Sequence, residues 1–162
     1  MIKELGNEIS EECLSFLRPE TKSRRNLVLI LLTMGETGFP HVCLLSPYQV
    51  VSRTRSELCF EVYPSSRTKR NLDRARKATL IIPESTALLY ASGETEHLID
   101  LIEPSPQSVY TLKVSSVLRD GSEDAPINSQ MTFDASVIGL DYRKAFDAML
   151  MSLESKKTGA SD

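Results

Sequence analysis

The chain has 162 residues, of which 41% are hydrophobic and 25% are charged, and its formal net charge at pH 7 is −3. A chain of this length forms one domain with its own core, and its acidic balance argues against a protein that binds polyanions in general. The three cysteines, Cys13, Cys43 and Cys59, lie among apolar neighbours, and the two histidines are far apart. This pattern predicts reduced core thiols rather than a disulfide framework or a metal site.

The first third of the chain predicts a helix followed by an antiparallel hairpin. Ser10 precedes two acids and apolar residues at helical spacing, and Pro19 should end this helix. Residues 27–34 are almost continuously apolar, which is typical of a strand buried on both faces. A glycine-rich turn follows, and residues 39–46 then form the second strand of the hairpin.

A third strand is predicted at residues 58–63, where Glu61 and Tyr63 point away from the face formed by the apolar residues. A helix then ends near residue 75. Three more strands and a C-terminal amphipathic helix follow, at residues 77–82, 87–94, 109–118 and 142–153. Gly93 predicts a bulge in the fifth strand.

Six strands joined mostly by short turns predict a mainly β fold, a small six-stranded antiparallel barrel with flanking helices. A helix between strands also fits an α/β sheet, but parallel strands each need a crossover and the helices are too few. We expect one domain over residues 1–154 and a disordered tail over residues 155–162. Acids near the N-terminus and the lack of a long apolar run predict a cytoplasmic protein without a membrane span.

Residues 65–72 have an unusual charge pattern for the start of a helix. Ser65 or Ser66 is a good N-cap, yet three basic side chains follow in the first turn, where the helix dipole disfavours cations. A bound phosphate would accept the free amide hydrogens of this turn and match its charge. A solvated, basic helix start explains the same residues without a ligand.

The order and spacing of these segments resemble the FMN-binding split barrels, the superfamily of pyridoxine 5'-phosphate oxidase and its smaller relatives. The resemblance covers about residues 9–117 and rests on the first helix, the hairpin around Gly38 to Val42, and Ser66 to Leu72 before the next strand. It implies a split β-barrel of the FMN-binding type and a homodimer with cofactor sites at the interface. It also implies an FMN-dependent oxidoreductase that acts on a small molecule.

The resemblance further implies that the segment beginning at Ser66 holds the FMN phosphate and that the flavin ring lies along residues 41–46. The candidate cofactor-binding residues are therefore His41, Val42, Cys43, Leu44, Ser46, Tyr63, Ser66, Arg67, Thr68, Lys69 and Asn71. Several have a second interpretation: His41 as a surface residue, Asn71 as an exposed helix residue, and Tyr63 as a side chain that fills the barrel mouth.

The chain departs from the oxidase pattern at several positions. Thr68 replaces a lysine, His41 and Ser46 replace the basic ends of the ring-binding strand, and the chain has no Trp. These departures argue against pyridoxamine phosphate oxidation, but they do not argue against flavin binding. No catalytic side chain is assigned, because the flavin ring carries the redox chemistry. The alternatives are a binding protein for haem, a deazaflavin or another phosphorylated ligand, whereas nucleic acid is disfavoured because few aromatic residues accompany the basic stretch.

Overall fold

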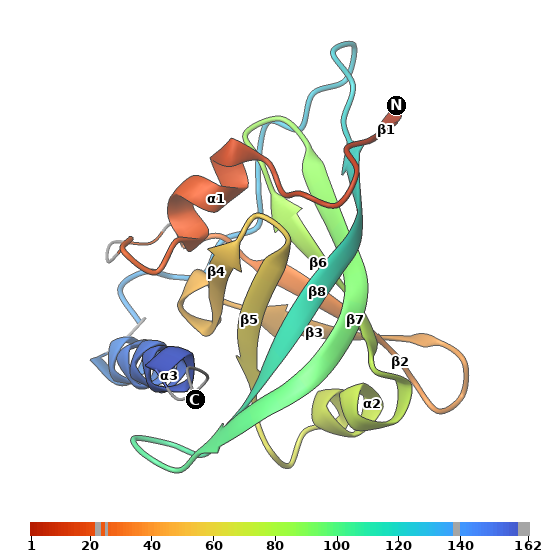
Figure 1. Ribbon diagram of the computed structural model, residues 1–162. Coiled ribbons are helices and arrows are strands. Elements are labelled where there is room, and N and C mark those ends of the chain that lie inside the picture. The colour runs from red at the N-terminus through yellow and green to blue at the C-terminus, as the bar shows by residue number, and fades with distance from the viewer. Residues whose placement is uncertain (22–23, 25, 138–139, 159–162) are drawn as a thin grey trace.

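The computed structural model describes residues 1–21, 24, 26–137 and 140–158. Its strands form one antiparallel sheet in the order β3-β2-β6-β7-β8-β5-β4, with β1 beside β8, and this sheet curls into an open barrel (Figure 1). The strands are β1 Ile2–Glu4, β2 Leu29–Met34, β3 Pro40–Leu45, β4 Val50–Thr54, β5 Glu57–Val62, β6 Lys77–Pro83, β7 Leu88–Leu101 and β8 Gln107–Asp120. The helices are α1 Glu11–Leu17, the 3-10 helix η1 Pro47–Gln49, α2 Arg67–Ala75 and α3 Leu140–Thr158.

This architecture confirms the predicted antiparallel barrel with flanking helices. All six predicted strands are present, but the count of six was wrong because the described residues form an 8-stranded sheet. The two missed strands, β1 and β4, have only 3 and 5 residues. Strands this short carry too little periodicity to be recognised from one sequence.

The β2–β3 hairpin forms as predicted, and Thr33 pairs with His41. Along β2, Leu29, Leu31 and Thr33 are buried, whereas Ile30 and Leu32 are only half-buried. The prediction that this strand is buried on both faces was therefore wrong for the single chain. Its inner face contacts the barrel core, and its outer face stays partly open.

The long β7–β8 ribbon crosses the barrel and contains the predicted bulge at Gly93 (Figure 1). A Cβ atom at this position would lie 1.9 Å from the backbone oxygen of Lys113. Since a backbone atom cannot rotate away as a side chain can, the close approach of the two strands requires glycine here.

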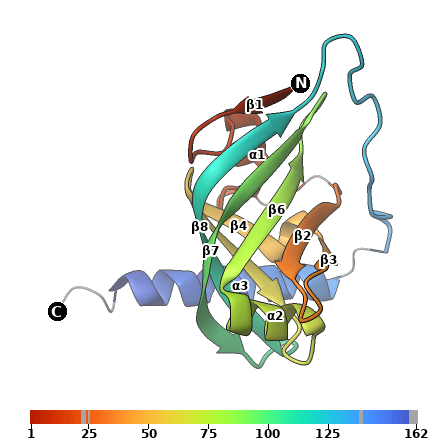
Figure 2. The ribbon, with the colours of Figure 1, turned by 90° about the vertical axis from the view of Figure 1, so that its right-hand side faces the viewer.

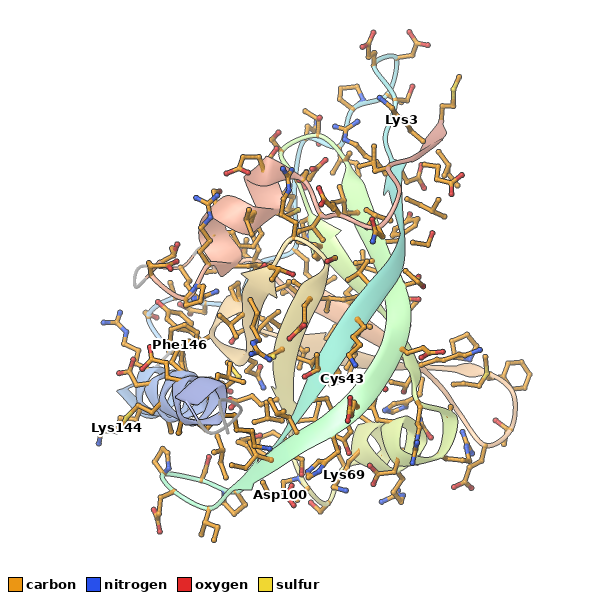
Figure 3. All side chains as sticks on the ribbon, viewed as in Figure 1. Lys3, Cys43, Lys69, Asp100, Lys144 and Phe146 are labelled. Atoms are coloured by element: carbon orange, nitrogen blue, oxygen red, sulfur yellow. The ribbon has the colours of Figure 1, made fainter. Side chains whose placement is uncertain are left out.

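The core has two parts. One fills the barrel, and the other lies outside it, where α3 covers β5 and β8 with Phe146, Met149 and Leu153. Figure 3 shows Phe146 on the side of α3 that faces the barrel and Lys144 on the opposite side. The helix continues to Thr158, four residues into the segment expected to be disordered from residue 155, and residues 159–162 lie outside the described ranges.

A long connection leads from β8 back to α3 beside β2 (Figure 2). We call the part of this connection formed by residues 131–137 the strap. The Val28 amide donates to the Met131 carbonyl at 3.0 Å, and the Phe133 amide donates to the Asn26 carbonyl at 2.8 Å. These bonds hold the strap next to the end of β3.

Arg24 joins α1, β4 and α3. Its guanidinium donates hydrogen bonds of 2.8–3.4 Å to the carbonyls of Phe16, Leu17, Arg18 and Val50. It also lies 4.2 Å from the centroid of the Phe146 ring. Because α1 has no basic residue in its last turn, Arg24 supplies the cation that stabilises the free carbonyls at this helix end.

Within the described ranges, no helix combines the length and the apolar character needed to cross a membrane.

Candidate functional site

A cavity of about 400 Å³ lies where β3 and β5 end, beneath the strap and the start of α3. Its lining residues are Leu44, Ser46, Gln49, Tyr63, Phe133, Asp134, Val137 and Tyr142. Three of them are aromatic, which suits contact with a planar ring. The volume falls in the range of small-molecule sites in proteins.

Ser46 lies in the wall of this cavity. The residue is 4% exposed, and its hydroxyl has no hydrogen-bond partner among the described residues. Its backbone amide donates to Oε1 of Gln49 at 3.0 Å, which fixes the Gln49 side chain against the same wall. Ser46 and Gln49 therefore form a fixed polar part of the cavity wall.

The start of α2 lies immediately after Tyr63. The Ser66 amide donates to the Tyr63 carbonyl at 3.0 Å, and the Ser66 hydroxyl caps the helix by accepting from the Lys69 amide at 3.1 Å. The amides of Arg67 and Thr68 have no partner within the helix, because the first turn has no preceding carbonyls to bond. There is no acid in this turn. The result is an anion-binding geometry beside the cavity.

The basic side chains of this turn point in different directions. Arg67 is exposed and has no side-chain partner among the described residues. Lys69 instead donates to Oδ2 of Asp73 at 2.7 Å, farther along the helix. Arg70 donates to the Ser65 carbonyl at 3.3 Å, across the turn. Arg67 is therefore the cation that remains free for an anion at the helix start.

Thr68 and Asn71 lie on the opposite face of α2, which packs against the barrel. Both are buried, and Nδ2 of Asn71 donates to Oγ1 of Thr33 at 3.1 Å. Asn71 therefore anchors the helix to β2.

The candidate residues on β3 divide between the two faces of that strand. Val42 and Leu44 lie on the outer face and are 55% and 49% exposed. His41 and Cys43 lie on the inner face, where they pair with Thr33 and Leu31. Of the predicted set, the structure brings Leu44, Ser46 and Tyr63 into the cavity, and Ser66 is joined to this wall by the bond from its amide to the Tyr63 carbonyl.

Sequence reasoning missed the residues that close the cavity from above. Phe133, Asp134 and Val137 belong to a segment for which no element was predicted, and Tyr142 was placed on the apolar face of the last helix. No local pattern predicts that a segment 90 residues after β3 returns to cover it. The carboxyl group of Asp134 accepts from the Ser136 amide and hydroxyl, which lowers its pKa.

Glu61 was also missed, although its position on β5 was predicted to face away from the barrel interior. It is 2% exposed, and Oε2 has no partner among the described residues. Burial raises the pKa of this carboxyl group to about 7. Glu61 lies two residues before Tyr63 on the same side of the strand, and burial raises the Tyr63 pKa, with Tyr142 and Glu61 contributing.

Comparison with known proteins finds likeness only at the level of structure. No family model matches the sequence, and no curated protein matches it. A candidate pyridoxamine 5'-phosphate oxidase from Lactobacillus delbrueckii superposes with a TM-score of 0.57 at 19% identity, over 71% of this chain and 98% of that one. An F420 reductase superposes with a TM-score of 0.52 at 15% identity, over 67% and 98%.

A heme-binding protein from Mycobacterium smegmatis also superposes, with a TM-score of 0.51 at 15% identity, over 74% of this chain and 55% of that one. These three proteins share an architecture, while their names describe different ligands. At such low identity the likeness establishes the fold and leaves the ligand open. The chain therefore has the split-barrel fold of the pyridoxamine 5'-phosphate oxidase-like proteins, as the resemblance in its sequence predicted.

Proposed function

We propose that this protein binds FMN and uses it as an oxidoreductase on a small substrate. The observation that carries the proposal is the start of α2, where free amides and the unpaired Arg67 side chain come shortly after Tyr63, an aromatic residue in the wall of the cavity. A phosphate at this helix start would accept from the Arg67 and Thr68 amides and pair with the guanidinium. The flavin ring would extend from there toward Tyr63.

The residues present fit the two ends of FMN. The phosphate end has basic side chains and no acid in the first turn of the helix. At the other end, the Gln49 amide offers hydrogen bonds to the polar edge of a ring, and Leu44 offers an apolar surface. Bound flavin would supply the hydride and electron transfer, and these residues would bind it, orient it and keep water away.

Replacing Arg67 with Ala tests the phosphate end. We expect FMN affinity to fall by about 1.5 to 3 kcal/mol, because a charge-assisted hydrogen bond to the phosphate is lost. Riboflavin, which has no phosphate, should bind the variant as well as it binds the wild type. The measurement is a fluorescence titration with each ligand.

A matched control for this experiment is Arg70→Ala, since the Arg70 side chain already bonds to the Ser65 carbonyl. The Arg70→Ala substitution should weaken FMN binding less than the Arg67→Ala substitution does. Equal losses of FMN and riboflavin affinity in Arg67→Ala would show that the phosphate is held elsewhere.

We also propose that the protein is a homodimer joined through the outer face of β2 and β3. This face carries Val42, Leu44 and Met34, each about half exposed, beside the half-buried Ile30 and Leu32. Contiguous apolar residues on a sheet face are more stable when a partner covers them. The cavity opens beside the same face, because Leu44 belongs to both.

Replacing Val42 with Asp should therefore shift the protein from dimer to monomer in sedimentation velocity, because a charge cannot be buried unpaired at the interface. The control is Met151→Asp, which places the same charge on an exposed part of α3. A wild-type protein that sediments as a monomer at micromolar concentration would contradict the dimer.

The second candidate function is binding of haem or a deazaflavin without turnover, supported by the names of the structural neighbours. The visible spectrum separates the two functions, because bound haem gives a Soret band that bound flavin lacks. To distinguish FMN from a deazaflavin, the bound cofactor is removed and FMN is added. An FMN-binding protein should take up the added FMN, whereas a protein specific for a deazaflavin should not.

A further inference from the structure

Glu61 lies on the face of β5 that α3 covers. Val109 is its direct partner across the β5–β8 pair, and Cys59 lies two residues before it on the same face of β5. Val109 and Cys59 both belong to the apolar cluster that includes Phe146 and Met149 of α3. The two nearest neighbours of Glu61 on these sides therefore pack in the layer beneath the helix.

The neighbour that follows Glu61 on this side of the chain also meets α3. Tyr63 lies two residues after Glu61. Burial raises the pKa of Tyr63, and Tyr142 at the start of α3 adds to this shift, which places the two phenol groups near each other. Glu61 itself is 2% exposed. Its carboxyl group is thus enclosed between β5 and the helix.

The charged and titratable groups on the elements around Glu61 are Arg24, Tyr48, Arg53, Glu57, Cys59, Tyr63, Lys113, Tyr142, Arg143, Lys144 and Asp147. The cations among them are engaged elsewhere or lie outside. Arg53 pairs with Glu57 at 2.7 Å, and Lys113 pairs with Glu96 at 3.4 Å. Arg24 donates to the Val50 carbonyl at 3.0 Å. Arg143 and Lys144 are exposed, and Figure 3 shows Lys144 on the side of α3 away from the barrel.

A negative charge on Glu61 would therefore have no partner. Oε2 forms no hydrogen bond within the described residues, and burial raises the pKa of the group without an opposing contribution from a neighbouring charge there. An ionised carboxylate in such a position is costly, whereas the protonated form is tolerated.

Side chains hold α3 to the barrel. In the part of the chain that the structure describes, no backbone hydrogen bond joins α3 to another element. The helix packs through its apolar cluster, Arg24 lies 4.2 Å from the centroid of the Phe146 ring, and the Lys156 ammonium donates to the Leu98 carbonyl. A helix held in this way can leave the sheet while the barrel strands stay paired.

We propose that the proton on Glu61 controls the docking of α3. With the proton in place, the helix stays on the barrel. Loss of the proton leaves an unpaired buried charge, and undocking of α3 returns that charge to water. Because Tyr142 lines the cavity described above, undocking also removes one of the cavity walls. The consequence for a bound ligand rests on the proposed function, whereas the docking of α3 does not.

The direction of the pH dependence follows from the two states of the helix. Burial raises the Glu61 pKa from 4.5 to about 7 when α3 is docked, and exposure restores the ordinary value when it is not. The docked state therefore binds the proton more tightly, so docking weakens as pH rises from 4.5 to 7 and changes little above 7. The equilibrium constant for undocking should rise on the order of 50-fold between about pH 5 and about pH 8.

The test is amide hydrogen exchange of the flavin-free full chain at pH 5 and pH 8, with each rate divided by the intrinsic rate of the same amide at that pH. We expect the protection of residues 145–153 to fall on the order of 50-fold from the lower to the higher pH. At both pH values these amides should be at least about tenfold less protected than those of β8, because undocking leaves the strands paired. Equal protection of α3 and β8 would overturn the proposal.

Glu61→Gln separates this carboxyl group from every other titrating group. The variant side chain stays neutral, so the protection of residues 145–153 should change less than about threefold over the same pH range. The matched control is Glu57→Gln, which removes an acid from the same strand and should keep the pH dependence of the wild type. A fall in protection as large in Glu61→Gln as in the wild type would overturn the proposal.

A second measurement reads the carboxyl group itself. In the chain with ¹³C-labelled glutamate, NMR should show Glu61 titrating near the pKa of about 7 that its burial gives. Replacing both Phe146 and Met149 with Ala removes apolar contacts of α3 with the barrel, so the Glu61 pKa should fall by at least about one unit toward its ordinary value. The control is Met151→Ala, because Met151 is 70% exposed. An unchanged pKa in the double variant would contradict the proposal.

Discussion

Replacing Arg24 with Met should lower the free energy of unfolding by about 3 kcal/mol or more. The substitution keeps most of the side-chain volume but leaves the carbonyls of Phe16, Leu17, Arg18 and Val50 without their shared donor. It also removes the cation above the Phe146 ring. Burial lowers the pKa of the Arg24 guanidinium to about 10, so the group stays charged throughout the physiological pH range.

Urea unfolding at pH 7, followed by far-UV circular dichroism, measures this effect. The matched control is Arg18→Met, because Arg18 is an exposed residue that forms an ion pair with Glu11. Exposed pairs of this kind contribute less than about 1 kcal/mol. An Arg24→Met variant no less stable than Arg18→Met would show that the buried network does not hold α1 and α3 to the barrel.

Replacing Glu61 with Gln should stabilise the protein at pH 8 by about 3 kcal/mol and change it little at pH 4. Burial raises the Glu61 pKa from its ordinary value of 4.5 to about 7. At pH values between 4.5 and 7, Glu61 keeps its proton in the folded chain but has released it in the unfolded chain. The contribution of Glu61 to the stability of the wild type therefore falls as pH rises from 4.5 to 7, and above pH 7 the full cost of the buried charge is present.

Urea unfolding of wild type and Glu61→Gln at several pH values between 4.5 and 8 tests this sign. The difference between the two proteins should grow with pH and level off above 7. Glu57→Gln is the control, because Glu57 is more exposed on the same strand and is paired with Arg53 at 2.7 Å. Parallel stability curves for wild type and Glu61→Gln would mean that Glu61 is not held neutral in the folded state.

The sequence predicted the elements with strong local signals. Ser10 and Ser66 cap α1 and α2 as expected, and Gly93 marks a bulge because a side chain there would collide with β8. Side chains alternate between the two faces of β5, and this alternation correctly placed Glu61 on the face opposite the residues that fill the barrel. These features depend on residues close together in the chain, which a single sequence shows directly.

The candidate site was predicted only in part, for a physical reason. Ser66 and Arg67 were recognisable because cations at a helix start conflict with its dipole. Lys69 was assigned to the same turn, but it bonds to Asp73 one turn later, which only side-chain geometry reveals. The strap reaches the cavity through contacts such as Leu27 with Thr132, and pairing over such a sequence distance leaves no local pattern.

We propose that this split barrel binds FMN at the start of α2. The most direct measurement is an equilibrium titration of the purified chain with FMN, followed by the quenching of flavin fluorescence and by the visible spectrum. We expect saturable binding of one FMN per chain, with a higher affinity than for riboflavin, because the α2 amides and Arg67 would hold the phosphate. A colourless protein that leaves the fluorescence of added FMN unchanged would contradict it.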